Sequence, residues 1–294
     1  MARVLPPAVV LVTGATSGIG RAAALGLARD GYHVLATGRR ADQLRSLKAE
    51  AGAARLDTLR LDVTSPQSVA DARDEVLRLT DGHGVDALIN NAGYGQFGPL
   101  ELATERALEQ QYQTNVLGLV RVTAAFLPAM RERGSGRIVN ISSIAGRVAV
   151  PFMGLYHGTK YAVEALSDSL RREVAGFGVQ VVLVEPGAIR TGFKERSDAT
   201  LADSGVAGTP YFKAAARLQS LAGRYQDLAP GPERVVRLLR KVLRARRPRA
   251  RYMVPAIERL TVVLAKLLPT WLVDGAIRWS LGLTRRRLGP GLPR

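Results

Sequence analysis

The chain has 294 residues, of which 47% are hydrophobic, so it is long enough to bury the core of one large domain. It has no cysteine, which excludes disulfides and thiolate metal ligands, and its three histidines are too scattered to predict a metal site. The formal net charge of +17 is concentrated at one end, because residues 201–294 hold 19 Lys/Arg against 5 Asp/Glu, a net of +14.

In chain order, the apolar run 9–12 predicts a strand, the glycine-rich residues 13–20 a turn, and residues 21–29 a helix. Further strands are expected at 33–37, 56–61, 87–90, 137–141 and 180–184, with long helices at 104–133 and 156–177. Ser65 before Pro66 predicts the capped start of another helix. This alternation predicts an α/β fold, a doubly wound parallel sheet with helices on both faces, whose ligands bind beyond the carboxyl ends of the strands.

The glycine turn is the first candidate site. Gly14, Gly18 and Gly20 would let the backbone approach a pyrophosphate, and the amides at the start of the following helix would face its charge. The alternative is a tight strand-to-helix turn that binds nothing.

A second candidate site contains Tyr156 and Lys160, which lie four residues apart and share one face of a predicted helix. A nearby ammonium favours the phenolate of a tyrosine whose pKa is otherwise about 10, so Tyr156 could exchange protons. Ser143 could hold a substrate oxygen, and Asn115 could order a water relay. Taken alone, this spacing is common by chance and favours the alternative, a solvated helix face.

Residues at the end of the second predicted strand bear on the choice of cofactor. NAD-binding proteins place a carboxylate here for the ribose 2′-hydroxyl, whereas this chain has Gly38 followed by Arg39 and Arg40. Guanidinium groups suit the 2′-phosphate of NADP. The sequence therefore predicts NADP(H), with a solvated helix start as the alternative.

Between residues 9 and 191 the sequence resembles the short-chain dehydrogenase/reductase family, in motifs at 13–20, 62, 90–93, 115, 143, 156–160 and 186–191. The resemblance implies a Rossmann-type fold and a catalytic tetrad of Asn115, Ser143, Tyr156 and Lys160. Ser143 is preferred to its neighbour Ser142 because it lies thirteen residues before Tyr156, as in the family. The cofactor-binding residues implied are Thr13, Gly14, Thr16, Ser17, Gly18, Ile19, Gly20, Arg39, Arg40, Asp62, Val63, Asn91, Ala92, Gly93, Tyr156, Lys160, Pro186, Gly187, Ile189 and Thr191.

Residues 231–252 are similar to the 17-beta-hydroxysteroid and retinol dehydrogenase branch, in which a basic helix precedes an Arg-Tyr strand. The resemblance implies an NADP(H)-dependent oxidoreductase that interconverts a ketone or aldehyde and an alcohol of a lipophilic, steroid-, retinoid- or lipid-like substrate. It also implies a homodimer or homotetramer formed by the two long helices. The alternatives are an NADP(H)-binding redox sensor and a membrane- or partner-docking protein with vestigial catalysis.

The substrate segment is expected at about 191–230, within a single domain that covers residues 1–255. Four aromatic side chains in this segment could close an apolar pocket, although an ordinary surface loop is the alternative; they are Phe193, Tyr211, Phe212 and Tyr225.

The basic tail has two parts. In residues 234–251, Arg234, Arg237, Lys241 and Arg244 recur at helical spacing opposite apolar residues, which predicts an amphipathic helix with a solvated basic side. A second basic cluster occupies residues 285–287. Nucleic acid is not a predicted partner, because few aromatic residues stand between the charges and no nucleic-acid motif is present.

Residues 256–294 are predicted to form a basic, apolar helical extension. Its segment 260–283 contains Trp271 and Trp279, but Lys266, Asp274 and Pro269 argue against a membrane span. The choice lies between a helix at a membrane surface and a lid or subunit contact, and we expect packing on the domain or at an interface. Because the first fourteen residues lead directly into a strand, we expect no cleaved signal peptide and a cytoplasmic location, with peripheral membrane contact through the tail as the alternative.

Overall fold

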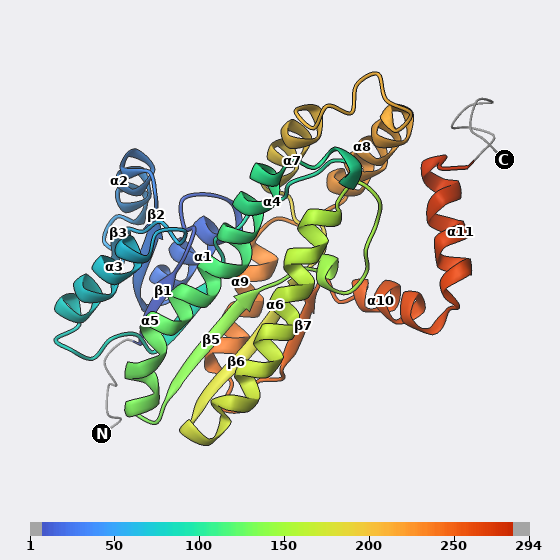
Figure 1. The fold of residues 1–294 in the computed structure, drawn as a ribbon. Helices are drawn as coiled ribbons and strands as arrows, with labels where there is room; N and C mark the ends of the chain where they lie inside the picture. The colour runs from blue at the N-terminus through green and yellow to red at the C-terminus, as the bar shows by residue number, and fades with distance from the viewer. Residues whose placement is uncertain (1–7, 285–294) are drawn as a thin grey trace.

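The computed structural model describes residues 8–284, which contain one seven-stranded sheet (Figure 1). All neighbouring strands are parallel, in the order β3-β2-β1-β4-β5-β6-β7. The predicted doubly wound fold is therefore confirmed, as are the six strands predicted from hydrophobic runs and the Arg-Tyr strand. The strands are β1 (Val9–Val12), β2 (His33–Gly38), β3 (Leu56–Arg60), β4 (Ala87–Asn90), β5 (Gly136–Ile141), β6 (Val179–Pro186) and β7 (Arg251–Val254).

Helices cover both faces of this sheet because successive side chains of a strand point to opposite sides. Val10 and Val12 pack with residues of α1, α2 and α9, whereas Val9 and Leu11 pack with residues of α3, α5 and α6. The helices are α1 (Gly18–Arg29), α2 (Ala41–Ala51), α3 (Pro66–Leu79), α4 (Glu105–Tyr112), α5 (Gly118–Glu132), α6 (Gly154–Glu173), α7 (Phe193–Ala202), α8 (Phe212–Asp227), α9 (Glu233–Arg244), α10 (Glu258–Leu267) and α11 (Thr270–Leu281).

The caps follow local side-chain chemistry. The Ser65 hydroxyl accepts a hydrogen bond from the Ser68 amide at 3.2 Å, so the predicted start of α3 is confirmed.

The predicted helix 104–133 is also found, but a π-helical turn, Gln113–Leu117, separates its two parts, α4 and α5. Such turns insert one extra residue into a helix and often accompany functional sites.

The basic helix α9 packs directly on α1. Its apolar side, including Val235 and Leu239, is buried, whereas the four cations predicted on its outer side are exposed. The close approach depends on Gly26 of α1, where a Cβ atom would lie 2.6 Å from Cγ1 of Val236. The amphipathic interpretation of this helix is therefore confirmed.

The segment after β6 forms helices α7 and α8, which lie above the carboxyl ends of the strands in Figure 1. Their buried residues form a separate apolar cluster with Phe152 and with Leu281 of α11. Helices α10 and α11 extend to one side, at the right of the figure. No helix within residues 8–284 is both long and apolar enough to cross a bilayer. The basic cluster predicted at 285–287 lies outside the described residues.

Candidate active site

The glycine turn joins β1 to α1 at the centre of the sheet. Gly14 and Gly18 have φ values of +63° and +53°, a region that side chains rarely adopt. A Cβ atom at Gly20 would lie 2.3 Å from the Gly14 carbonyl oxygen and 2.4 Å from Nδ2 of Asn91. The turn can therefore form only with glycines at these positions, and it brings the start of α1 against the loop after β4.

Thr13 and Asn91 fasten these two loops together. The Thr13 hydroxyl accepts hydrogen bonds from the amides of Asn91 and Ala92 at 2.9 and 3.0 Å, and the Asn91 side chain donates to the carbonyls of Thr13 and Gly14. The side chains of Thr13 and Asn91, both predicted cofactor residues, thus form hydrogen bonds to the backbone of these two loops. They hold the glycine turn against the loop after β4.

Several other predicted cofactor residues border the glycine turn at the carboxyl edge of the sheet. The Ser17 side chain makes no capping hydrogen bond, so it does not cover the first amides of α1. Gly18 faces Thr191, because a Cβ atom there would lie 3.4 Å from Cβ of Thr191. Helix amides and small side chains of this kind suit a pyrophosphate. Those partly or fully exposed are Gly14, Thr16, Ser17, Gly18, Ile19, Gly187 and Thr191.

Arg39 and Arg40 are exposed at the carboxyl end of β2. Gly38 keeps the chain close to the glycine turn, since a Cβ atom there would lie 2.5 Å from Cγ2 of Thr16. The Arg39 charge also acts on Tyr94, whose pKa is raised by burial and lowered in part by this guanidinium. Arg39 is thus near the loop after β4.

Asp62 and Val63 follow the neighbouring strand β3. One carboxylate oxygen of Asp62 accepts hydrogen bonds from the Thr64 amide at 3.0 Å and the Thr64 hydroxyl at 2.8 Å. Val63 is buried, and Gly118 of α5 leaves room for it. These two residues stabilise the loop that follows β3.

The four residues of the predicted tetrad lie just after β5, on α6 and in the π turn, and all are buried. The Ser143 hydroxyl donates to the Pro186 carbonyl at 3.2 Å and accepts from the Ala145 amide at 3.1 Å. Ser143 also lies close enough to Tyr156 to act on the pKa of its phenol. The serine and tyrosine hydroxyls therefore meet at the carboxyl edge of the sheet, where ligands of this fold bind.

Lys160 lies beside the tyrosine ring. Its Nζ atom is 5.8 Å from the ring centroid of Tyr156 and donates to the Ile141 carbonyl at 2.8 Å. Burial lowers the pKa of Lys160 to about 8, although the charge of Glu164 opposes this shift. The same helical face therefore carries both groups, as the four-residue spacing predicts.

The effect on Tyr156 differs from our expectation. We expected the Lys160 ammonium to lower the pKa of the phenol, but burial raises the pKa of Tyr156 to about 12, and Ser143 only partly offsets the rise. Desolvation is thus the larger influence on the pKa of this phenol. Without a ligand, Tyr156 is therefore held in its protonated form.

Asn115 occupies the π turn and holds the loop after β4. Its Oδ1 atom accepts from the Tyr94 amide at 3.1 Å, while Nδ2 donates to the Tyr94 carbonyl at 2.9 Å and to the Thr159 hydroxyl at 3.1 Å. The side chain thus connects this loop to α6. A water relay at Asn115 stays a prediction.

Two aromatic side chains, Phe97 and Phe193, pack beside Tyr156 and are called the aromatic wall here. The ring of Phe193 lies 5.4 Å and that of Phe97 lies 6.2 Å from its centroid. Phe193 was predicted to border an apolar pocket, whereas Phe97 was missed, although it follows the Asn-Ala-Gly motif closely in the sequence. Tyr211 and Tyr225 lie elsewhere, with their hydroxyls on Glu101 and Glu258.

A cluster of two glutamates and two arginines, which the sequence did not indicate, begins one helical turn beyond Lys160. Glu164 of α6 and Glu185 of β6 are buried beside Arg147 and Arg251. Burial and the charge of Glu164 raise the pKa of Glu185 to about 7, against the effect of the two arginines. Only the structure brings these residues together, since they come from four separate segments.

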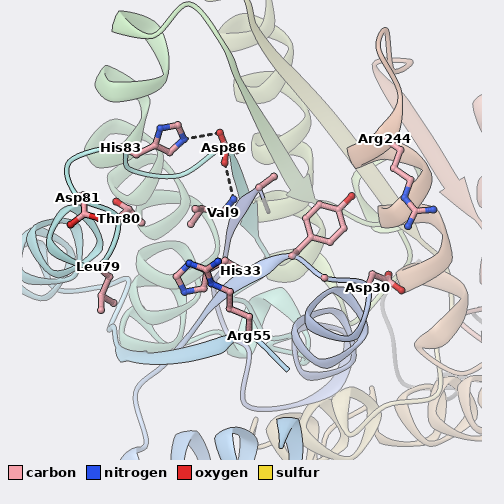
Figure 2. A pocket seen from close by; sticks show the side chains of 13 residues that line it. Val9, Asp30, His33, Arg55, Leu79, Thr80, Asp81, His83, Asp86 and Arg244 are labelled. Carbon is pink, nitrogen blue, oxygen red and sulfur yellow. Dashed lines mark hydrogen bonds and ion pairs between the residues drawn. The ribbon is translucent and has the colours of Figure 1, made fainter. Parts of the chain in front are cut away.

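A cavity of about 820 Å³ lies at the opposite, amino edge of the sheet. Figure 2 shows its lining, in which Asp86 contacts His83 at 2.9 Å and the Val9 amide at 2.7 Å. His33 pairs with Asp57 at 2.8 Å. Within residues 8–284, no three His, Cys, Asp or Glu side chains are arranged to hold a metal. None of the predicted site residues lines this cavity.

The parallel sheet, the glycine turn and the buried serine, tyrosine and lysine at its carboxyl edge define a dinucleotide-binding oxidoreductase of the Rossmann type. A family model described as short chain dehydrogenase matches residues 8–202. The chain therefore belongs to the short-chain dehydrogenase family.

Three curated relatives cover most of the chain. An uncharacterized oxidoreductase, YbbO, of Escherichia coli strain K12 is 38% identical over 265 residues, 90% of this chain and 92% of its own. Human 17-beta-hydroxysteroid dehydrogenase type 1 is 38% identical over 268 residues, with 83% and 76% covered, and human retinol dehydrogenase 5 is 37% identical over 290 residues, with 93% and 89% covered. The expected likeness to this branch is confirmed.

Two solved structures show both forms of the nicotinamide cofactor. A short chain dehydrogenase/reductase from Burkholderia phymatum in complex with NAD has a TM-score of 0.74 and 26% identity, with 92% of this chain and 95% of that chain covered. An alcohol dehydrogenase from Thermococcus sibiricus complexed with 5-hydroxy-NADP has a TM-score of 0.69 and 27% identity, with 84% and 95% covered. Nicotinamide cofactors are therefore bound by proteins with this fold.

Proposed function

We propose that this protein is an NADP(H)-dependent oxidoreductase that interconverts a lipophilic ketone or aldehyde and its alcohol. The observation that carries the proposal is the meeting of Ser143, Tyr156 and Lys160 beside the aromatic rings of Phe97 and Phe193. Such a group can bind a carbonyl oxygen and exchange one proton with it. The apolar rings exclude water from the same point.

Each residue has a separate task in this reaction. A nicotinamide dinucleotide held by the glycine turn and Arg39 would provide the hydride chemistry for a carbonyl compound and its alcohol. Ser143 holds the substrate oxygen, and the protonated Tyr156 phenol donates its proton to that oxygen in the direction of reduction. Lys160 stabilises the phenolate that remains, because its ammonium lies over the tyrosine ring, 5.8 Å from the ring centroid.

Arg39 and Arg40 support the choice of NADP(H). They are exposed at the carboxyl end of β2. Position 38 is a glycine, whereas NAD-binding proteins have an acidic residue there that binds the ribose 2′-hydroxyl. Two guanidinium groups can make charged hydrogen bonds to a 2′-phosphate.

The lipophilic nature of the substrate is supported by the site and by the relatives. The side chains nearest Tyr156 are aromatic, and the names of two relatives refer to a hydroxysteroid and to retinol. A flat or elongated apolar carbonyl compound suits a site bordered by the packed rings of Phe97 and Phe193.

The test is the initial rate of NADPH oxidation with steroid, retinoid and simple aromatic carbonyl compounds, measured for the wild type and for Tyr156→Phe. We expect at least about a thousandfold loss of kcat in the variant, because no other described hydroxyl replaces the proton donor. Binding of NADPH, measured by calorimetry, should change little. Near wild-type turnover in Tyr156→Phe would exclude the assigned chemistry, whereas tight NADPH binding without turnover on any compound would favour a redox sensor.

A further inference from the structure

The C-terminal hairpin, defined here as residues 256–281, exposes much apolar surface. Leu267, Trp271 and Trp279 are exposed to 77%, 70% and 70%. In Figure 1 the hairpin forms an arm that leaves the body after β7, with α10 along its base and α11 beside α8. The large hydrophobic residues that it exposes are Ile257, Leu260, Val263, Leu264, Leu267, Leu268, Trp271, Leu272 and Trp279.

The hairpin also has an inner face, which fixes its orientation. In α11, Ile277 and Leu281 recur at a spacing of four and join the apolar cluster of α7 and α8. In α10, Glu258 and Val262 are buried at the same spacing, and the Glu258 carboxylate accepts a hydrogen bond from the Tyr225 hydroxyl. The exposed residues lie on the remaining sides of both helices, so the apolar surface is held outward by the fold.

The charges around this surface are mainly positive. Arg259, Lys266 and Arg278 are exposed on the hairpin, where Asp274 is the one exposed acid among the described residues. Apolar residues with indole rings, flanked by cations, are the pattern that anionic lipid surfaces bind.

We propose that the C-terminal hairpin docks this protein on the surface of an anionic lipid bilayer. Helices of 10 and 12 residues are about 15 to 18 Å long, too short to span a bilayer, so they lie in its interface. A second copy of the chain would bring the same positive charges and is disfavoured as the occupant. Because α11 packs on α8, docking places the membrane beside the helices that cover the aromatic wall.

This inference goes beyond the proposed activity, and its test measures binding alone. The full-length protein is sedimented with vesicles of equal parts phosphatidylglycerol and phosphatidylcholine, and with vesicles of phosphatidylcholine only. We expect binding to the anionic vesicles, weakened by salt, and at least about a tenfold lower partition coefficient for the double variant Trp271→Ser/Trp279→Ser. Phe177→Ser, which removes an aromatic ring exposed to 49% after α6, is the matched control and should bind as the wild type does.

Far-UV circular dichroism establishes that each variant is folded. Three results would overturn the proposal. They are absence of wild-type protein from the vesicle pellet, equal binding to both kinds of vesicle, and equal binding of the double variant. A fourth is dissociation of the lipid-free protein into smaller species when both tryptophans are replaced, because the hairpin would then be a contact between subunits.

Discussion

Burial shifts the pKa values of Tyr156 and Lys160 in opposite directions. It raises the pKa of the phenol to about 12 and lowers that of the ammonium to about 8, because desolvation disfavours the charged form of each. At neutral pH the phenol therefore carries its proton in the absence of ligands. A site in this state is prepared to donate a proton, which is the requirement for carbonyl reduction.

We expect the preference for NADPH over NADH to depend on single side chains. We expect Arg39→Ala to raise the KM for NADPH by about tenfold and that for NADH by less than about twofold, because only NADPH carries the 2′-phosphate that we propose this guanidinium binds. Steady-state rates with both cofactors measure this difference. The control is Arg55→Ala, which removes an exposed arginine at the cavity on the opposite edge of the sheet. Equal losses for the two cofactors would contradict the assignment.

At the scale of helices and strands, most of the fold could be predicted because the strands are buried on both faces. Continuous apolar runs such as 87–90 are typical of parallel strands, and the predicted bounds of that strand agree with β4. The cap at Ser65 was likewise predictable, since it depends on neighbouring residues only. Local patterns therefore determine these elements.

What could not be predicted depends on contacts between distant segments. The π turn at Gln113–Leu117 interrupts a stretch whose sequence favours a continuous helix, and it is stabilised where Asn115 reaches Tyr94. Phe97 adjoins Tyr156 only because the loop after β4 folds over α6. The pKa of Tyr156 depends on its complete burial, which residue spacing does not reveal.

The contact between α6 and the strands β6 and β7 leads to a pH prediction. Glu185 has a raised pKa of about 7 in the folded protein against an ordinary value near 4.5, so the folded state binds its proton more tightly. The stability that this adds is complete below pH 4.5 and is lost as the pH rises to 7. We expect the free energy of unfolding to fall by up to about 3 kcal/mol over this range on account of Glu185.

Glu185→Gln should remove this dependence, because an amide does not titrate. Urea unfolding followed by far-UV circular dichroism at pH 5 and pH 8 measures it. Glu132→Gln, at an exposed carboxylate of α5, is the control and should leave the pH slope unchanged. If the Glu185 variant and the wild type lose the same stability between these pH values, Glu185 does not titrate as described.

For the whole molecule, α4, α5 and α6 present a second apolar surface. Leu117, Val120, Tyr161 and Leu166 are exposed to between 40% and 45%. This is the surface through which we predict that a homodimer or homotetramer forms.

The variant Val120→Arg/Leu166→Arg should therefore be monomeric, because two charges would be buried without partners at the contact. Sedimentation velocity of the wild type and the variant measures this change. Leu221→Arg, at a residue of α8 exposed to 44%, is the control and should keep the wild-type assembly. A monomeric wild type, or an unchanged assembly of the double variant, would contradict the predicted interface.

The location of the two tryptophans has a spectroscopic consequence. The chain contains only Trp271 and Trp279, and both lie on α11. Intrinsic indole fluorescence therefore reports on the polarity around one helix, while the seven strands contribute no indole signal. A blue shift of this emission would report a change at α11 without any label, whereas unfolding of the sheet would alter it little.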